Sequence, residues 1–214
     1  MKHILTNVFI VISSLLIGFF FAEVALRLIN SSGNNYDIEM WQYSKKLKKI
    51  SSNVSLGHEH VKSSNAILQN VEVRTNSLGM RGPEPKQVFE RRILFLGSSI
   101  TMGWGVEEGN IFTTIIEKKF KLDGFEVDIL NSGVGNYNTE RYIENFFLNL
   151  EILKPDDIVI HYFINDVEIL KHSTGNFITR NLQIGVVAWR VYNQIFGNIG
   201  ETSLEKYYKS LYLE

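Results

Sequence analysis

Residues 93–106 read I-L-F-L-G-S-S-I-T-M-G-W-G-V, and this stretch indicates the fold class. The four apolar residues 93–96 are typical of a short strand buried on both faces, as strands of parallel sheets are. Gly97 ends the run and permits a sharp turn. Ser98 and Ser99 are therefore expected at the carboxyl edge of the sheet, where open α/β sheets bind ligands. Taken alone, the stretch is more readily explained as an ordinary Gly-Ser turn than as a catalytic site.

The sequence that follows alternates between helix and strand patterns. Amphipathic helices are expected over residues 111–120 and 138–153, and buried strands over residues 127–130 and 158–164. Helices between successive strands imply parallel pairing with right-handed crossovers. All three strands then end at one edge of the sheet, where the clusters G-S-S, N-S-G-V-G-N-Y-N and N-D follow them.

These three clusters together contain the groups that acyl transfer requires. The first offers a hydroxyl, the second a glycine-rich turn with free N–H groups, and the third a carboxamide. A nucleophile and hydrogen-bond donors aimed at a developing oxyanion are the working parts of such a site. Any one cluster is explained by a turn, but three at one edge predict a functional site.

The same clusters resemble the blocks of the SGNH, or GDSL-type, hydrolase family, in a membrane-anchored bacterial branch. The matching pieces lie within residues 71–166 and read N-S-L-G-M-R-G-P-E, L-G-S-S-I-T-M-G-W-G-V, N-S-G-V-G-N-Y-N-T-E-R and F-I-N-D. The resemblance implies a flavodoxin-like three-layer α/β/α fold with a parallel sheet, incomplete at the C-terminus. It also implies ester hydrolysis or acyl transfer with no metal and no cofactor.

Residue roles follow from this resemblance. Ser99 matches the nucleophile, and its own N–H is one oxyanion donor. Asn136 stands at the position of the second-block glycine, whose N–H is another donor, and asparagine tolerates a positive φ there. Asn165 matches the third-block asparagine, whose side-chain amide also donates. Asp166 matches an aspartate that we expect to order its loop rather than to take part in the chemistry.

Three features depart from the family pattern. Ser98 stands where the family usually has aspartate, and Phe163 replaces a glycine. The family's late Asp-x-x-His block, which supplies the general base, is missing: no aspartate follows Asp166, and we interpret His172 as a surface-loop residue. Because loss of a triad base costs on the order of a million-fold in turnover, we expect either the N-terminal part of a longer hydrolase, which we favour, or a hydrolase-like protein with little activity.

The N-terminal segment has the pattern of a membrane helix. Residues 4–22 carry no charge, and nineteen helical residues rise about 28 Å, close to the thickness of a hydrocarbon core. We assign residues 1–29 to a transmembrane signal anchor that contacts the membrane through residues 4–29, with a removed signal peptide as the alternative. Lys2 favours an extracytoplasmic location of the remaining chain, in the periplasm or at the cell surface.

Residues 30–90 are expected to form a juxtamembrane connector, and residues 91–214 the N-terminal portion of a hydrolase-like domain that ends in two helices. Within the connector, the lysine run 45–49 is interpreted as a solvated helix face, with a lipid-headgroup contact as the alternative. The His-Glu-His sequence at 58–60 is interpreted as a surface loop rather than a metal-binding pair. Alternation over residues 71–75 predicts an edge strand.

Composition limits the classes of function. A net charge of -1 and a pI near 6.5 give no electrostatic footprint for nucleic acid. The absence of cysteine excludes disulfides and thiolate metal sites. We therefore predict a membrane-anchored serine esterase acting on acyl or acetyl esters, including carbohydrate-linked ones. The alternatives are an O-acyltransferase of envelope polysaccharide and a non-catalytic glycan- or acyl-binding module. A nucleotide binder ranks last, because both common phosphate-loop motifs are missing.

Overall fold

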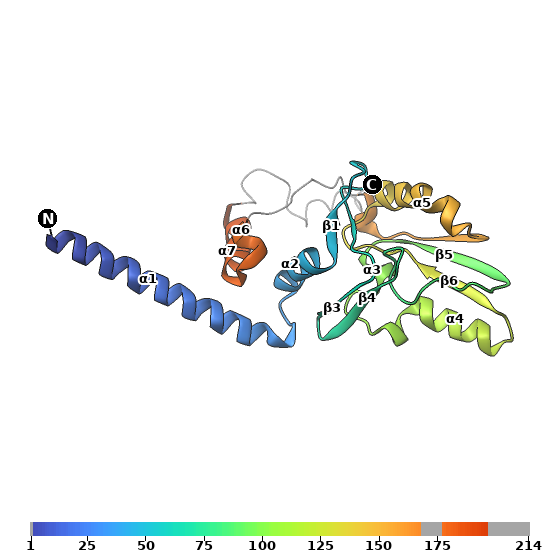
Figure 1. Cartoon of the computed structure of the whole chain (residues 1–214), viewed down its shortest axis with the longest axis horizontal. Coiled ribbons are helices and arrows are strands. Elements are labelled where there is room, and N and C mark those ends of the chain that lie inside the picture. The colour runs from blue at the N-terminus through green and yellow to red at the C-terminus, as the bar shows by residue number, and fades with distance from the viewer. Residues whose placement is uncertain (1, 168–176, 197–214) are drawn as a thin grey trace, which may run out of the picture. The chain divides into compact units, whose positions relative to one another are not determined.

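The computed structural model describes residues 2–167 and 177–196, without the side chains of Lys2, Asn165, Asn193, Gln194 and Phe196. The chain divides into two compact units (Figure 1). Residues 1–41 and 175–214 belong to the first unit, and residues 42–174 to the second.

The second unit is built on a parallel sheet of three strands. The strands are β5 (Arg91–Gly97), β6 (Val127–Asn131) and β7 (Asp157–His161), and β5 lies between the other two. Phe95 pairs with Asn131 of β6, and Gly97 pairs with His161 of β7. The α/β class and the parallel pairing predicted from the sequence are confirmed.

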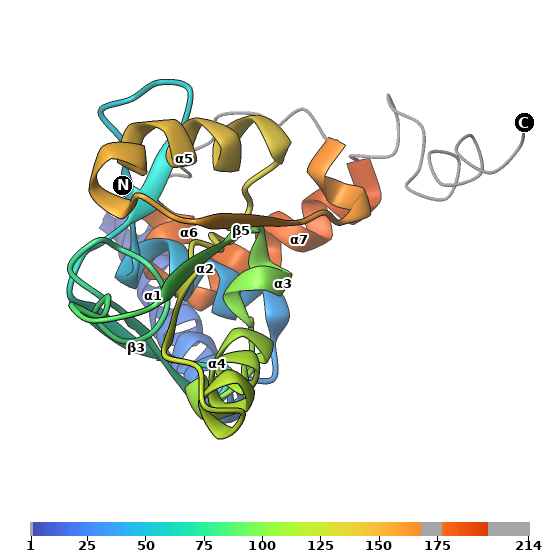
Figure 2. The same cartoon turned by 90° about the vertical axis from the view of Figure 1, so that its right-hand side faces the viewer.

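Helices cover both faces of this sheet (Figure 2). On one face, the buried leucines of β5 and β6 pack with Tyr142 and Leu153 of α5 (Thr139–Leu153). On the other face, Phe95, Val127 and Ile129 pack against α4 (Phe112–Leu122). Successive residues of a strand point to opposite faces, so the continuous apolar runs bury side chains under both helices.

The third strand differs from its prediction as a fully buried strand. In β7 the side chains of Ile158 and Ile160 are 45% and 53% exposed. Within the described residues β7 pairs with β5 alone. It is therefore an edge strand, with no described strand along its other side to cover it. The strand also ends earlier than predicted, because η3 (Ile164–Val167) follows it as a short 3-10 helix.

Two antiparallel hairpins precede the sheet. The first joins β1 (Lys48–Ile50) to β2 (His58–His60), and the second joins β3 (Ser64–Leu68) to β4 (Val71–Thr75), which confirms the strand predicted at 71–75. Buried Arg81 connects the second hairpin to the sheet. Its N–H donates to the Asn131 carbonyl at 3.0 Å, and its guanidinium donates to the carbonyls of Glu72 and Val106.

The lysine run does not form a single solvated helix face, so that prediction is wrong. Helix α2 (Tyr36–Lys46) ends within the run, Leu47 is fully buried, and Lys48 begins β1. The Lys48 ammonium lies 4.4 Å from the centroid of the Tyr43 ring. Burial, together with the nearby charge of Arg141, lowers the pKa of Lys48 to about 7. The run changes from helix to strand because its central leucine belongs to the core.

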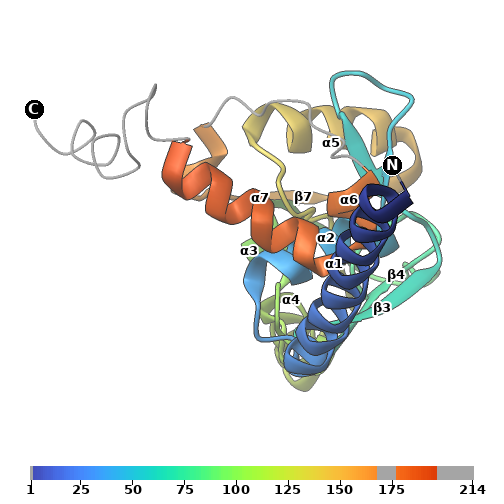
Figure 3. The same cartoon turned by 90° about the vertical axis from the view of Figure 1, so that its left-hand side faces the viewer.

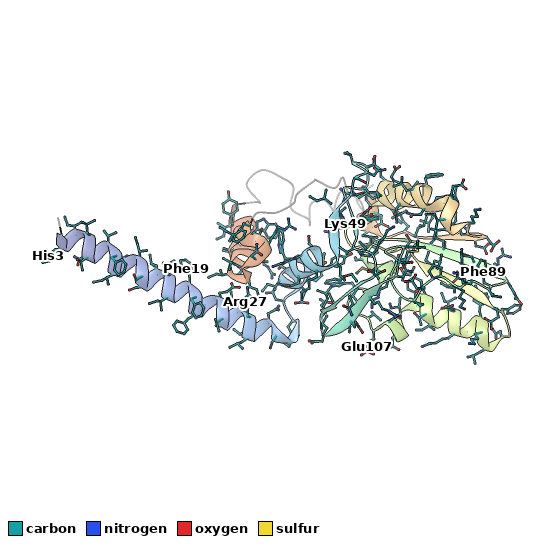
Figure 4. The ribbon with its side chains drawn as sticks, in the orientation of Figure 1. His3, Phe19, Arg27, Lys49, Phe89 and Glu107 are labelled. Atoms are coloured by element: carbon teal, nitrogen blue, oxygen red, sulfur yellow. The ribbon has the colours of Figure 1, made fainter. Side chains whose placement is uncertain are left out.

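The first unit contains a long apolar helix, α1 (Lys2–Ile29), followed by η1 (Asn30–Ser32). Among the described residues this is the one helix long and apolar enough to cross a membrane, as an anchor or as a signal sequence. Its apolar side chains project on all sides between His3 and Arg27 (Figure 4). Glu23 and Arg27 form an i,i+4 ion pair at 2.7 Å.

Two further helices, α6 (Phe177–Asn181) and α7 (Gln183–Phe196), complete the described part of this unit (Figure 3). Helix α7 confirms the first of the two helices predicted near the end of the chain. The second lies outside the described residues.

Candidate functional site

Ser99 lies at the turn that follows β5. It is the first residue of α3 (Ser99–Met102), directly after Gly97 and buried Ser98. Gly97 has no space for a side chain, because a Cβ atom there would overlap the Thr101 hydroxyl. The Ser99 carbonyl accepts a hydrogen bond from the Trp104 N–H at 3.1 Å. No described residue is hydrogen-bonded to the half-buried Ser99 side chain.

The turn after β6 packs directly against this first turn. The Val134 N–H donates to the Gly97 carbonyl at 3.3 Å, and the Asn131 side chain donates to the Thr101 carbonyl at 2.6 Å. A Cβ atom at Gly133 would overlap the backbone of α3, so the two turns approach as closely as a glycine allows. The convergence of these two strand ends, expected from the sequence, is present.

Asn136 lies at the exposed tip of the second turn. Its φ is 65°, in the left-handed region that asparagine tolerates better than most residues. Its carbonyl accepts a weak hydrogen bond from Arg141 at 3.4 Å. Among the described residues, no acceptor is bonded to its N–H. Among the described residues, the Asn136 N–H is therefore available as a hydrogen-bond donor, which is the role that the resemblance assigns to it.

The turn after β7 is closed by Asp166. This buried carboxylate accepts the Phe163 N–H at 2.9 Å, and the Asp166 carbonyl accepts the Thr139 hydroxyl at 3.1 Å. Asp166 thus orders its loop and connects it to the start of α5, next to the second turn. Asn165 belongs to η3, but its side chain lies outside the described part of the chain, so its role stays a prediction. His172 also lies outside the described residues.

His58 and His60 do not lie in a surface loop, and that interpretation is wrong. They occupy strand β2, whose pairing with β1 turns both imidazoles inward. His60 is buried, with its Nδ1 2.9 Å from the Gly79 carbonyl and its Nε2 2.6 Å from the Tyr43 hydroxyl. His58 places its Nε2 3.0 Å from the carbonyl of Gly135, in the second turn.

Tyr43 completes a network that holds Gly135 from both sides. Its hydroxyl oxygen accepts the Gly135 N–H at 2.9 Å. Because carbonyls only accept, His60 carries its proton on Nδ1, and its Nε2 accepts the Tyr43 proton. By the same reasoning His58 is protonated on Nε2. A Cβ atom at Gly135 would lie 2.6 Å from Tyr43 Cε1, so the phenol packs directly on the turn. The Tyr137 hydroxyl donates to the His58 carbonyl at 2.7 Å.

Burial keeps this network neutral. It lowers the pKa of His58 to about 3 and the pKa of His60 to about 4, and it raises the pKa of Tyr43 well above its ordinary value. Neutral imidazoles with both nitrogens engaged act here as rigid supports of the turn. The two-residue spacing of His58 and His60 is the only sequence signal of this arrangement, and nothing in the sequence connects either histidine to Tyr43.

His161 is a further imidazole at the same edge. It ends β7, where its Nδ1 lies 3.2 Å from the Thr101 hydroxyl and its ring packs edge-on against Phe112. This histidine therefore has other partners than Ser99. The strand predicted over residues 158–164 placed His161 in its interior, so the sequence pattern did not indicate that this imidazole lies at the edge.

No family model and no curated protein matches the sequence. Solved structures that are similar to part of it include two of the same esterase. One is the crystal structure of AlinE4, an SGNH-hydrolase family esterase, at 22% identity and a TM-score of 0.32. The other is a mutant of the same esterase, at 22% identity and a TM-score of 0.31. Each match covers 35% of this chain and 41% of the other, so the chain spans less than half the length of these esterases. A likeness of this extent does not decide what this chain does.

Proposed function

We propose that this chain is a membrane-anchored serine ester hydrolase of the SGNH type, with a flavodoxin-like three-layer α/β/α fold. Ser99 is the nucleophile, and the N–H groups of Ser99 and Asn136 with the Asn165 carboxamide are the oxyanion donors. The substrates are acyl or acetyl esters, including carbohydrate-linked ones. The observation that carries the proposal is the packing of the second turn on α3, which brings the Asn136 N–H to the same edge as the Ser99 hydroxyl; neither group is hydrogen-bonded to another described residue.

The proposed reaction uses these groups in two steps. The Ser99 oxygen attacks the acyl carbon, its proton passes to a general base, and the carbonyl oxygen becomes the oxyanion that the donors stabilise. The ester C–O bond then breaks, and the alcohol leaves with the proton. Water attacks the acyl-enzyme in the same way and releases the acid. A removed oxyanion donor typically costs about 100- to 1,000-fold in turnover.

We place the general base outside the described residues. Within the described part of the second unit, His58, His60 and His161 are each bonded to groups other than Ser99. The same observation favours the second candidate, a non-catalytic module that binds a glycan or an acyl group at this edge. An O-acyltransferase of envelope polysaccharide would use the same nucleophile and donors, with a sugar hydroxyl in place of water.

The proposed location follows from the first helix. Helix α1 would anchor the chain in a membrane, and Lys2 before the apolar stretch favours an extracytoplasmic position for the second unit.

The test is labelling by a fluorophosphonate probe in membranes of cells that express the gene. Ser98→Ala is the matched control, because Ser98 is a neighbouring serine whose side chain is buried away from solvent. We expect labelling of the unmodified protein and of Ser98→Ala, and none of Ser99→Ala. Equal labelling of Ser99→Ala would overturn the assignment of the nucleophile. A protein that is folded but never labelled would favour the binding module.

A further inference from the structure

Helix α7 carries an apolar face that the described protein does not cover. Ile184, Ala188, Val191 and Ile195 follow the spacing of a single helical face, and Tyr192 lies beside them. The side chains of Val191, Tyr192 and Ile195 are 45%, 61% and 59% exposed. We call the residues Ala188, Val191 and Ile195 the apolar face of α7. A face of this kind needs an occupant of its own.

The other side of α7 is attached to its own unit. Arg190 forms an ion pair with Asp37 of α2 at 2.8 Å, and the Trp189 ring meets the Trp41 ring edge-on with centroids 6.1 Å apart. Val186 is buried. These contacts fix which side of the helix faces the described part of the first unit, and the apolar face lies on the opposite side.

The start of α7 is bound to α1 at a defined level. The Glu23 carboxylate accepts the N–H groups of Gln183 at 3.1 Å and Ile184 at 2.9 Å, and the Arg27 guanidinium donates to the Asn181 carbonyl at 3.0 Å. Glu23 is the first charged residue after the uncharged stretch 4–22. If α1 spans a bilayer, Glu23 therefore marks its surface, and α7 begins there.

Helix α7 also has the orientation of a helix that lies in a membrane surface. It crosses α1 instead of running alongside it: Figure 1 shows α1 at full length and α7 almost end-on, whereas Figure 3 shows α7 at full length. A helix that crosses a spanning helix at the level of the headgroups lies close to the plane of the membrane. Tryptophan and tyrosine, present here as Trp189 and Tyr192, are the residues enriched at that depth.

We propose that α7 is an interfacial helix that inserts its apolar face into the headgroup–acyl boundary of the bilayer that α1 spans. This inference rests on the proposed anchoring role of α1 and is independent of the chemistry at Ser99. Continuity with α1 is the reason to choose lipid over protein as the occupant, because α7 begins at Glu23 and Arg27, where the uncharged stretch of α1 ends. The first unit is then attached to the membrane at two points, by the spanning helix α1 and by the interfacial helix α7.

The absence of cysteine from the chain permits a direct test by single-site spin labelling. The full chain is reconstituted in nanodiscs of phosphatidylcholine and phosphatidylglycerol. Nitroxides are attached separately at Val191→Cys, Ile195→Cys, Leu15→Cys and Arg190→Cys. Accessibility to oxygen, which concentrates in lipid, is compared with accessibility to a water-soluble nickel chelate. Leu15 reports on α1, and Arg190 is the matched control on the protein side of α7.

We expect the oxygen-to-nickel ratio at positions 191 and 195 to exceed that at position 190 several-fold, which corresponds to a depth of about 5–10 Å. The label at position 15 should lie near the bilayer centre. Nickel-accessible labels at 191 and 195 with a membrane-embedded label at 15 would overturn this inference and leave the anchor intact. Labels at 191 and 195 that are shielded from both reagents would overturn it in favour of a protein partner or a second copy. A water-accessible label at 15 would overturn the anchor as well.

Discussion

Replacement of Tyr43 by phenylalanine isolates the hydroxyl that supports the second turn. The phenol is completely buried, and its oxygen is bonded to the Gly135 N–H at 2.9 Å and to His60 Nε2 at 2.6 Å. The variant keeps the ring and leaves both partners buried without a hydrogen bond. An unsatisfied buried polar group costs about 1–3 kcal/mol. We therefore expect the free energy of unfolding to fall by about 2–4 kcal/mol.

The assay is urea unfolding of the detergent-solubilised chain, followed by tryptophan fluorescence. Tyr162→Phe is the matched control, because its side chain is 55% exposed, and surface substitutions of this kind change stability by less than about 0.5 kcal/mol. If ester turnover is established, Tyr43→Phe should also lower kcat with little change in KM, because a loosened Gly135 releases the adjacent Asn136 N–H. A Tyr43→Phe protein as stable as the Tyr162→Phe control would refute the reasoning.

Three further predictions concern the same unit. Burial holds the pKa of His60 at about 4, below its ordinary value of 6.5, so the unfolded chain binds the extra proton first as the pH falls. His60 should therefore leave stability unaffected above about pH 6.5 and contribute a loss of about 1.4 kcal/mol per pH unit toward pH 4, to which His58, with a pKa of about 3, adds a similar loss. His60→Gln should reduce the slope by the His60 share, and an unchanged slope would contradict this. Gly133→Ala should lower the free energy of unfolding, measured in a thermal melt, by at least about 2 kcal/mol, because its Cβ atom would overlap the backbone of α3. Gly109→Ala is the control and should not destabilise the protein, because its Cβ atom would meet only the Lys118 ammonium, at 3.8 Å. Arg92→Met should lower the free energy of unfolding by about 3–5 kcal/mol, because it leaves the buried Asp128 carboxylate without the guanidinium that lies 2.7 Å from it. An unchanged urea midpoint would show that this ion pair is dispensable.

The sheet and the meeting of its first two strand ends could be predicted because both depend on local patterns. The apolar runs at 93–96 and 127–130 specify strands, and the helices between them require parallel pairing. Once the strands are parallel, the turns that carry Ser99 and Asn136 must share an edge. The positive φ of Asn136 was also accessible, because few residue types adopt it.

The histidine network could not be predicted in the same way. Tyr43 and Gly135 are 92 residues apart, and His58 and Gly135 are 77 apart. Nothing in the local pattern of a three-residue strand indicates that its imidazoles are buried beneath a distant turn. A His-x-His pair in a short strand is equally typical of an exposed hairpin. The polar residues of the His-Glu-His sequence therefore favoured a surface loop, which is wrong.

The exposure of β7 and the change from helix to strand within the lysine run also depend on contacts with distant parts of the chain, so the local sequence did not predict them. An apolar run such as 158–160 predicts a strand, but whether both of its faces are covered depends on elements elsewhere in the chain. In the lysine run, charge suggested a solvated helix, while the single residue Leu47 belongs to the core and ends that helix.

The central claim is that the hydroxyl of Ser99 reacts beside the N–H groups of Ser99 and Asn136, and a crystal structure of the phosphonylated protein tests it most directly. We expect an adduct on the Ser99 oxygen, with the phosphonyl oxygen about 3 Å from both backbone nitrogens. An adduct on another residue, or one whose oxygen points away from Asn136, would contradict it.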